Sequence, residues 1–129
     1  MVITADDIET ARHLAAGGIA TFARFSIMDG KVRSPVADGD RDQLERLHAA
    51  YDMKNHTRGA NDAAALAPEF ADRFAILGPP AHYIERINEL ADAGIDRLIV
   101  VGPSTDADPA LASKARSQFT SEVMPALRQ

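Results

Sequence analysis

The sequence predicts a helix-rich α/β fold in which parallel strands alternate with helices. Three observations predict it: two short, wholly apolar runs at residues 74–77 and 98–101, an amphipathic segment between them, and a mostly helical pattern over residues 1–73. Strands that are apolar throughout are typical of parallel sheets whose two faces are both covered. The two runs and the segment between them therefore predict a βαβ unit, which is right-handed by default.

The first helix is predicted over residues 5–26. Thr4 is a candidate cap for it, because a threonine oxygen can accept a hydrogen bond from a free N–H of the first turn. Apolar residues then recur at helical spacing. Gly17 and Gly18 interrupt this stripe and weaken the helix by about 1 kcal/mol each relative to alanine.

The middle of the chain is predicted to contain two loops and a second helix. Turn signals place one loop at residues 29–40, and Asp40 is a candidate cap for the helix that follows. One face of that helix carries Leu44, Leu47 and Tyr51. A polar, irregular loop is predicted at 52–62, followed by a helical turn at 63–66 and another turn opened by Pro68.

The second half is predicted to read strand, helix, strand, helix. The strand at 74–77 is closed by Gly78, and the helix after it ends at Gly94, which suits the left-handed stop of a helix. The strand at 98–101 leads to a last helix capped by Asp108. One face of the last helix carries Ala112, Ala115, Phe119, Val123 and Ala126.

Two strands do not make a sheet with both faces covered, and Val2 and Ile3 are predicted to be the tail of a third. We therefore interpret residues 1–129 as a single partial domain, in which 74–129 form a closing βαβα unit. The exposed edges of so small a sheet would be an aggregation hazard. We expect a homo-oligomer, or pairing with another chain, to cover them.

Composition narrows the function classes. The chain has 129 residues, is 46% hydrophobic and 26% charged, carries a net charge of −5 and contains no cysteine. The negative charge disfavours nucleic acid as a partner. No apolar run reaches the length of a membrane span, and the lack of cysteine excludes disulfides and thiolate chemistry while fitting a cytoplasmic location.

Two loops after the predicted strands are candidates for a substrate pocket. The first contains Gly78 and Pro79, and the second contains Gly102, Ser104 and Thr105. A loop that leads into a helix presents free N–H groups to a phosphate or carboxylate. The alternative is that glycine and proline only end one element and begin the next; for the second loop the extra polar side chains leave the two readings balanced.

His56 is a further candidate for the substrate pocket. An imidazole suits proton transfer near neutral pH, whereas the simpler alternative is a solvated loop histidine. No histidine pair has the spacing of a metal site, and we expect no metal.

Most of the chain resembles the luciferase-like monooxygenases. The residues that carry this resemblance are 72–80, 84–86 together with 89–97, and 119–128, with weaker matches at 4–11 and at Tyr51, Asp52 and His56. The first two stretches resemble the family's seventh strand, seventh helix and eighth strand. The weaker match at Tyr51 and His56 is similar to the branch that uses a deazaflavin.

The resemblance implies the C-terminal part of a (β/α)8 barrel, with its late helices and last two parallel strands. It also implies an oxidoreductase or monooxygenase that uses FMN or the deazaflavin coenzyme F-420 on a small organic substrate. Such barrels have about 250 residues and hold the cofactor mainly with earlier loops. We therefore assign no catalytic residue and do not expect the chain to be active alone.

Two alternatives to that function are retained. In the first, the chain is a non-catalytic truncated chain or subunit that dimerises or docks on a partner. In the second, it is a small phosphate-ligand binder that uses the two Gly-Pro loops.

Overall fold

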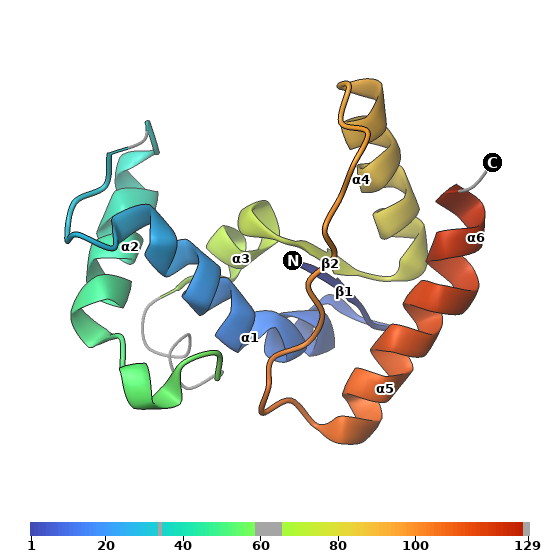
Figure 1. The fold of residues 1–129 in the computed structure, drawn as a ribbon, viewed down its shortest axis with the longest axis horizontal. Coiled ribbons are helices and arrows are strands. Elements are labelled where there is room, and N and C mark those ends of the chain that lie inside the picture. The colour runs from blue at the N-terminus through green and yellow to red at the C-terminus, as the bar shows by residue number, and fades with distance from the viewer. Residues whose placement is uncertain (34, 59–65, 128–129) are drawn as a thin grey trace.

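The computed structural model describes residues 1–33, 35–58 and 66–127. Helices surround a two-stranded parallel sheet (Figure 1). The strands are β1 (Val2–Thr4) and β2 (Ile76–Gly78), and the helices are α1 (Ile8–Arg24), α2 (Asp38–Ala50), α3 (Pro68–Phe74), α4 (Pro80–Asp92), α5 (Pro109–Gln118) and α6 (Met124–Leu127). Helical turns at Phe25–Ile27, Met53–Asn55 and Phe119–Val123 extend or join these elements.

The sheet confirms the strand predicted at Val2 and Ile3. β1 pairs with β2 in parallel, with Val2 opposite Ile76 and Thr4 opposite Gly78. The two strands are far apart in sequence, so the helices between them complete the crossover that a parallel pair requires. The structure is therefore a helix-rich α/β arrangement with a small parallel sheet.

The strand predicted at 74–77 is displaced toward the C-terminus. Phe74 ends α3, where its ring stacks on Phe70 with 5.4 Å between ring centroids. The N–H of Ala75 still donates to the carbonyl oxygen of Ala71 at 2.9 Å. Because this bond completes the last turn of α3, extended backbone begins only at Ile76.

The strand predicted at 98–101 is wrong, and with it the βαβ unit. Residues 95–102 form no strand, and Figure 1 shows this segment crossing the sheet between α4 and α5. Its one backbone bond to β1 joins Val2 N–H to Val101 O at 3.1 Å. The backbone groups of successive residues in a strand point to opposite edges. Met1 and Ala5 direct theirs to β2, so Val2 directs its N–H to the other edge of β1.

Two helix starts also differ from the sequence prediction. Asp7, rather than Thr4, caps α1 by accepting from Thr10 N–H, while Thr4 is buried in β1. The α2 helix begins at Asp38, so Asp40 lies in its first turn and the loop predicted at 29–40 is shorter. Carboxylates in the first turn remain favourable there because of the helix dipole.

The other predicted elements are largely confirmed. Pro68 opens α3, Gly94 follows α4 with a φ of 92°, and Asp108 caps α5. The loop predicted at 52–62 contains the turn Met53–Asn55, and its residues 59–62 lie outside the described residues. The helical turn predicted at 63–66 lies outside them too, except for Leu66.

The hydrophobic core gathers on α1. Its inward face is made of small and aliphatic residues, which let α2, α3 and β2 approach closely. A smaller cluster of Tyr83, Ile87 and Val123 joins α4 to the C-terminal helix. Within the described ranges, none of the helices combines the length and apolarity needed to cross a bilayer.

Candidate functional site

The structure separates the predicted pocket residues into two groups. Ser104, Thr105 and His56 gather beside the middle of α1, whereas Gly78 and Pro79 lie where β2 turns into α4. A β-carbon on Gly78 would lie 3.9 Å from Ile8, at the start of α1. Ser104 bonds at Gly17, nine residues further along α1, which is about 14 Å of helix.

Ser104 anchors its loop to α1. Its hydroxyl oxygen accepts from Gly17 N–H at 2.9 Å, and its own N–H donates to the carbonyl oxygen of Leu14 at 2.7 Å. The residue is 9% exposed. Because both polar groups of Ser104 are engaged, its role in this structure is to hold the 102–105 turn in place.

Thr105 binds the neighbouring loop through Thr57. The two hydroxyl groups lie 3.0 Å apart, and the Thr105 hydroxyl also donates to the Thr57 carbonyl oxygen at 3.2 Å. Thr57 has a φ of 66°. A β-branched residue is strained in this left-handed region, so these contacts hold a conformation that costs about 1–3 kcal/mol.

His56 belongs to a polar cluster around Tyr51. The Tyr51 hydroxyl lies 2.7 Å from His56 Nδ1 and 3.1 Å from the Thr21 hydroxyl. Arg24 places its guanidinium 4.8 Å from the centroid of the Tyr51 ring. A cation against the ring face favours this packing, and a hydroxyl paired with imidazole is suited to proton transfer or to binding a polar ligand.

Sequence reasoning missed Thr21 in this cluster and did not place Arg24 beside Tyr51. Both lie on α1 within two turns of Gly17, and Thr21 donates to the carbonyl oxygen of Gly17 at 2.7 Å. The chain of contacts therefore runs from Ser104 through Gly17 and Thr21 to Tyr51. The helical spacing of residues 17, 21 and 24 was the available signal, but nothing in the sequence indicated that Tyr51 would face them.

The first Gly-Pro loop shapes the entry to α4. Gly78 has a φ of 127°, which only glycine adopts without strain, and its carbonyl oxygen accepts from Ala5 N–H at 3.0 Å. Pro79 precedes the helix and its carbonyl oxygen accepts from His82 N–H at 3.0 Å. These contacts account for both residues as a strand-to-helix turn.

The second Gly-Pro loop does not lead directly into a helix. α5 begins only at Pro109, and the carboxylate of Asp108 accepts from the N–H groups of Ala110 and Leu111. Two of the N–H groups that a phosphate would need are therefore occupied by the cap. The 102–105 loop is therefore separated from the first turn of α5 by the Asp108 cap.

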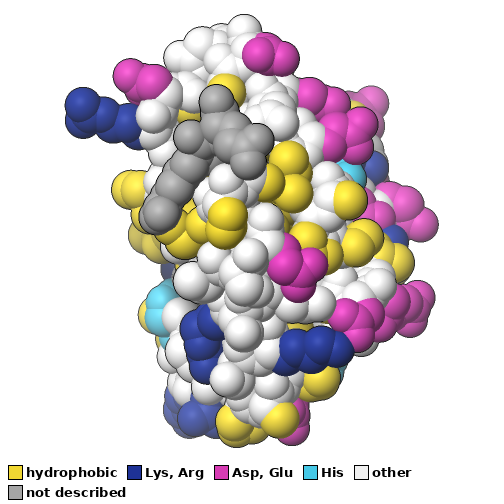
Figure 2. All heavy atoms as spheres, turned by 90° about the vertical axis from the view of Figure 1, so that its right-hand side faces the viewer, with side chains coloured by type: hydrophobic (Ala, Val, Ile, Leu, Met, Phe, Trp, Pro, Cys, Tyr) yellow, Lys and Arg dark blue, Asp and Glu magenta, His cyan; other side chains and the backbone are white. Residues whose placement is uncertain are grey.

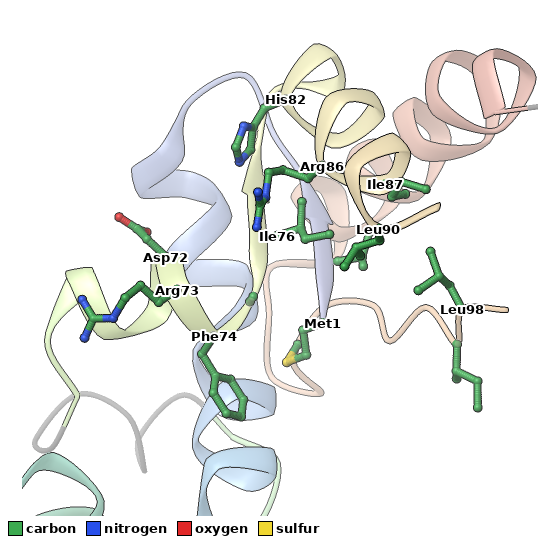
Figure 3. A pocket seen from close by; sticks show the side chains of 13 residues that line it. Met1, Asp72, Arg73, Phe74, Ile76, His82, Arg86, Ile87, Leu90 and Leu98 are labelled. Carbon is green, nitrogen blue, oxygen red and sulfur yellow. The ribbon is translucent and has the colours of Figure 1, made fainter. Parts of the chain in front are cut away.

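A cavity of about 630 Å³ lies beside the start of β2, away from both groups. Figure 3 shows Leu98 facing Ile76 and Leu90 across it, with His82 and Arg86 at one end. Asp72 also lines that end, where the Arg12 guanidinium holds the pKa of its carboxyl below the usual range by hydrogen bonding. The remaining wall is mostly apolar.

The candidate pocket residues are held by contacts within the protein. A ring of the flavin type requires a pocket that joins several polar groups. Here Gly78 and Ser104 lie at different points along α1, and the hydroxyl groups of Ser104 and Thr105 bond to Gly17 and Thr57. Among the described residues, no cluster of three histidine or carboxylate side chains is placed to hold a metal ion.

Charges of both signs cover the surface. On the face over α4, α5 and α6, basic side chains lie mainly toward one end and acidic ones elsewhere, with exposed hydrophobic side chains between them (Figure 2).

Comparison with protein-family models, with curated proteins and with solved structures found no match. A functional assignment therefore depends on the residues themselves.

Proposed function

We propose that this chain supplies the closing part of a luciferase-like oxidoreductase barrel that uses FMN or coenzyme F-420. The observation that carries the proposal is the segment from Asp72 to Gly94, where the family pattern coincides with a strand, a Gly-Pro turn and a helix ended by a left-handed glycine. The reaction would be hydride transfer to or from a small organic substrate, or oxygen activation. When bound, the cofactor supplies the redox chemistry.

The contribution of this chain would be to shape the barrel rather than to hold the cofactor. Gly78 turns β2 into α4, and Ser104 fixes the following loop on α1. His56 and Tyr51 are the residues of this chain best suited to contact a polar substrate, since His56 is exposed to solvent and hydrogen-bonded to the tyrosine.

Fragment complementation tests this function. A luciferase-like barrel that lacks the part resembled by residues 1–129 would be mixed with this chain, and cofactor binding would be followed by quenching of FMN or F-420 fluorescence. We expect binding to appear only when both pieces are present. If the two pieces do not co-elute, or if quenching does not depend on the chain, the proposal is rejected.

Titration of the chain alone provides the control. We expect no quenching of either cofactor at micromolar concentration, because the hydroxyl groups of Ser104 and Thr105 are engaged with Gly17 and Thr57. Micromolar binding by the isolated chain would show that the chain holds a complete cofactor site and that its role is not merely to close a barrel.

A non-catalytic subunit that requires a partner is the second candidate. It is favoured by exposed apolar residues after α4, above all Ile99, which is 93% exposed. Sedimentation across a range of concentrations tests it. A dimer would support this candidate, whereas a monomer at all concentrations would exclude self-association as the way these residues are covered.

A further inference from the structure

We propose that Thr21 and Tyr51 hold the imidazole of His56 in the form that carries its hydrogen on Nδ1, so that Nε2 accepts a hydrogen bond from a substrate. The inference deepens the proposed function and rests on it for one point, that a substrate lies beside His56. Three observations carry it: a hydroxyl bound to a carbonyl, a chain of three contacts, and an exposed imidazole whose Nδ1 belongs to that chain.

The chain of contacts begins at a group that can only accept. This group is the carbonyl oxygen of Gly17, and the Thr21 hydroxyl lies 2.7 Å from it. A hydroxyl carries one hydrogen and two lone pairs. Because the only hydrogen of the Thr21 hydroxyl points to Gly17, this hydroxyl can meet any other partner only as an acceptor.

The Tyr51 hydroxyl stands between Thr21 and His56. It lies 3.1 Å from the Thr21 hydroxyl and 2.7 Å from His56 Nδ1. Since Thr21 is the acceptor at the first contact, a hydrogen bond there uses the only hydrogen of Tyr51. The Tyr51 oxygen then meets His56 with a lone pair, and the hydrogen between them comes from Nδ1. All three contacts are hydrogen bonds only when Nδ1 is protonated.

The other neutral form of the imidazole would leave the chain with one hydrogen bond fewer. Tyr51 would donate to His56 Nδ1, and the oxygen atoms of Tyr51 and Thr21 would face each other at 3.1 Å without a hydrogen between them. Thr21 is only 6% exposed, so water has little access to that contact. One net hydrogen bond shifts an equilibrium about five- to tenfold, and here it favours the form with hydrogen on Nδ1.

Packing holds the two rings in place. The guanidinium of Arg24 covers one face of the Tyr51 ring, 4.8 Å from its centroid. The backbone that follows His56 rests on α1, where a β-carbon on Gly17 would lie 2.4 Å from the Thr57 carbonyl oxygen. The imidazole therefore meets the tyrosine from a backbone that is itself fixed against the helix.

The second imidazole nitrogen of His56, Nε2, is the group that would meet a ligand. His56 is exposed, and within the described part of the chain its only hydrogen bond is made through Nδ1. A neutral imidazole with hydrogen on Nδ1 has a lone pair on Nε2. The ligand group that fits is therefore an N–H or O–H donor, whereas an anion that can only accept does not fit. Thr21 and Tyr51 are positioning residues, because they act on the substrate through His56.

Nitrogen NMR of the imidazole rings measures which nitrogen carries the hydrogen. The full chain would be labelled with nitrogen-15 and studied at about pH 8, where an ordinary histidine is neutral. The chain has four histidines, so the His56→Gln variant identifies the signals of His56. We expect the form with hydrogen on Nδ1 to exceed the other by about fivefold or more. Equal amounts of the two forms, or an excess of hydrogen on Nε2, would overturn the proposal.

Thr21→Val separates positioning from packing, because valine keeps the shape of threonine and lacks its hydroxyl. Tyr51 then loses its acceptor and turns its hydrogen to His56, so we expect the imidazole hydrogen to move to Nε2. Thr21→Ser is the matched control, and its hydroxyl should keep the hydrogen on Nδ1. The same ratio of the two forms in both variants would reject the role of Thr21. If the valine variant does not fold, Tyr51→Phe is the second test and should give the ratio of a free histidine.

Reaction with 4-nitrophenyl acetate tests whether Nε2 presents its lone pair to a small molecule. Nε2 bonds to the acetyl carbon, the ester C–O bond breaks to release 4-nitrophenolate, and the ring loses the proton of Nδ1. The rate that belongs to His56 is the difference between the unmodified chain and His56→Gln. We expect Thr21→Val to lower this rate about fivefold or more and Thr21→Ser to preserve it.

A rate that is equal with and without His56, or unchanged in the valine variant, would show that Nε2 does not present a lone pair. Both measurements need only this chain. A failed complementation with a barrel would therefore reject the proposed function and leave the state of the imidazole as measured. An imidazole with hydrogen on Nε2 would reject the present inference and leave the complementation result unchanged.

Discussion

A β-carbon on Gly17 would lie 2.4 Å from the carbonyl oxygen of Thr57 and 2.4 Å from the carbonyl carbon of Arg58. The atoms in the way belong to backbone, which cannot move aside as a flexible side chain does. Gly17 is therefore required for the 57–58 segment to rest on α1. Gly17 weakens the helix when judged from the sequence alone, and in the structure it provides the surface on which the 57–58 segment packs.

Gly17→Ala should destabilise the protein by about 1–3 kcal/mol, even though alanine favours a helix, because the loop must be displaced. Gly39→Ala is the matched control. Gly39 lies in the first turn of α2 and has open space around it, so alanine should raise the stability by up to about 1 kcal/mol. Urea unfolding followed by circular dichroism measures both changes; equal effects at the two sites would show that the loop does not rest on Gly17.

Ser104→Ala should lower the free energy of unfolding by about 1 kcal/mol, because Gly17 N–H loses a buried acceptor. Ser113→Ala provides the comparison, since Ser113 is exposed on α5 and should change stability by less than about 0.5 kcal/mol. Chemical denaturation of the two variants under identical conditions gives the difference. A neutral Ser104→Ala variant would mean that the hydroxyl does not anchor the loop.

Tyr83 should make the protein sensitive to alkali. Its side chain is fully buried and its hydroxyl donates to the carbonyl oxygen of Ile76. Burial raises the pKa of Tyr83 far above its ordinary value. Because the folded pKa exceeds the unfolded value of about 10, the contribution to stability is complete below about pH 10 and is lost as the pH rises above it.

Denaturation at about pH 8 and at about pH 11 should therefore show a loss of stability that Tyr83→Phe reduces. The chain has two tyrosines, so the Tyr51→Phe variant isolates the absorbance change of Tyr83 on ionisation. That absorbance should appear only together with unfolding. Ionisation of Tyr83 in the folded protein would contradict its burial.

Asp72 should contribute to acid sensitivity. Arg12 donates two hydrogen bonds to its carboxylate, at 2.9 and 2.5 Å, and hydrogen bonding to Arg12 lowers the pKa of Asp72. The contribution is complete above the unfolded pKa of about 4 and is lost as the pH falls below it. The carboxylate is 37% exposed, so solvent screening limits the effect to about 1 kcal/mol or less.

Asp72→Asn should therefore lower stability near neutral pH and flatten its dependence on pH below about 4. Glu45→Gln serves as the control, because Glu45 is exposed in the middle of α2 and forms no ion pair with another described residue. Thermal unfolding across this pH range measures both variants. Identical acid profiles for the wild type and Asp72→Asn would indicate that the pair with Arg12 does not persist in solution.

The candidate site was only partly predictable. His56, Ser104 and Thr105 were chosen as polar residues in loops, and the structure does bring them to the same stretch of α1. Their chemistry differs from the prediction, because Ser104 and Thr105 bond to the protein itself. Thr21 was missed, and Arg24 was not placed beside Tyr51, because the sequence does not show which turn of a helix a distant loop will contact.

The sequence by itself determined the elements that depend on near neighbours. Apolar spacing located the helices, and Asp108, Pro68 and Gly94 marked their ends, because caps and left-handed stops act within a few residues. Only the tertiary structure decided the course of residues 98–101. An apolar run of this kind favours a strand, but it does not specify which strand edge it will lie against. Here the path of the segment is set by the bond from Val2 N–H to Val101 O and by the bond from Gly17 of α1 to Ser104, both between residues more than 80 positions apart.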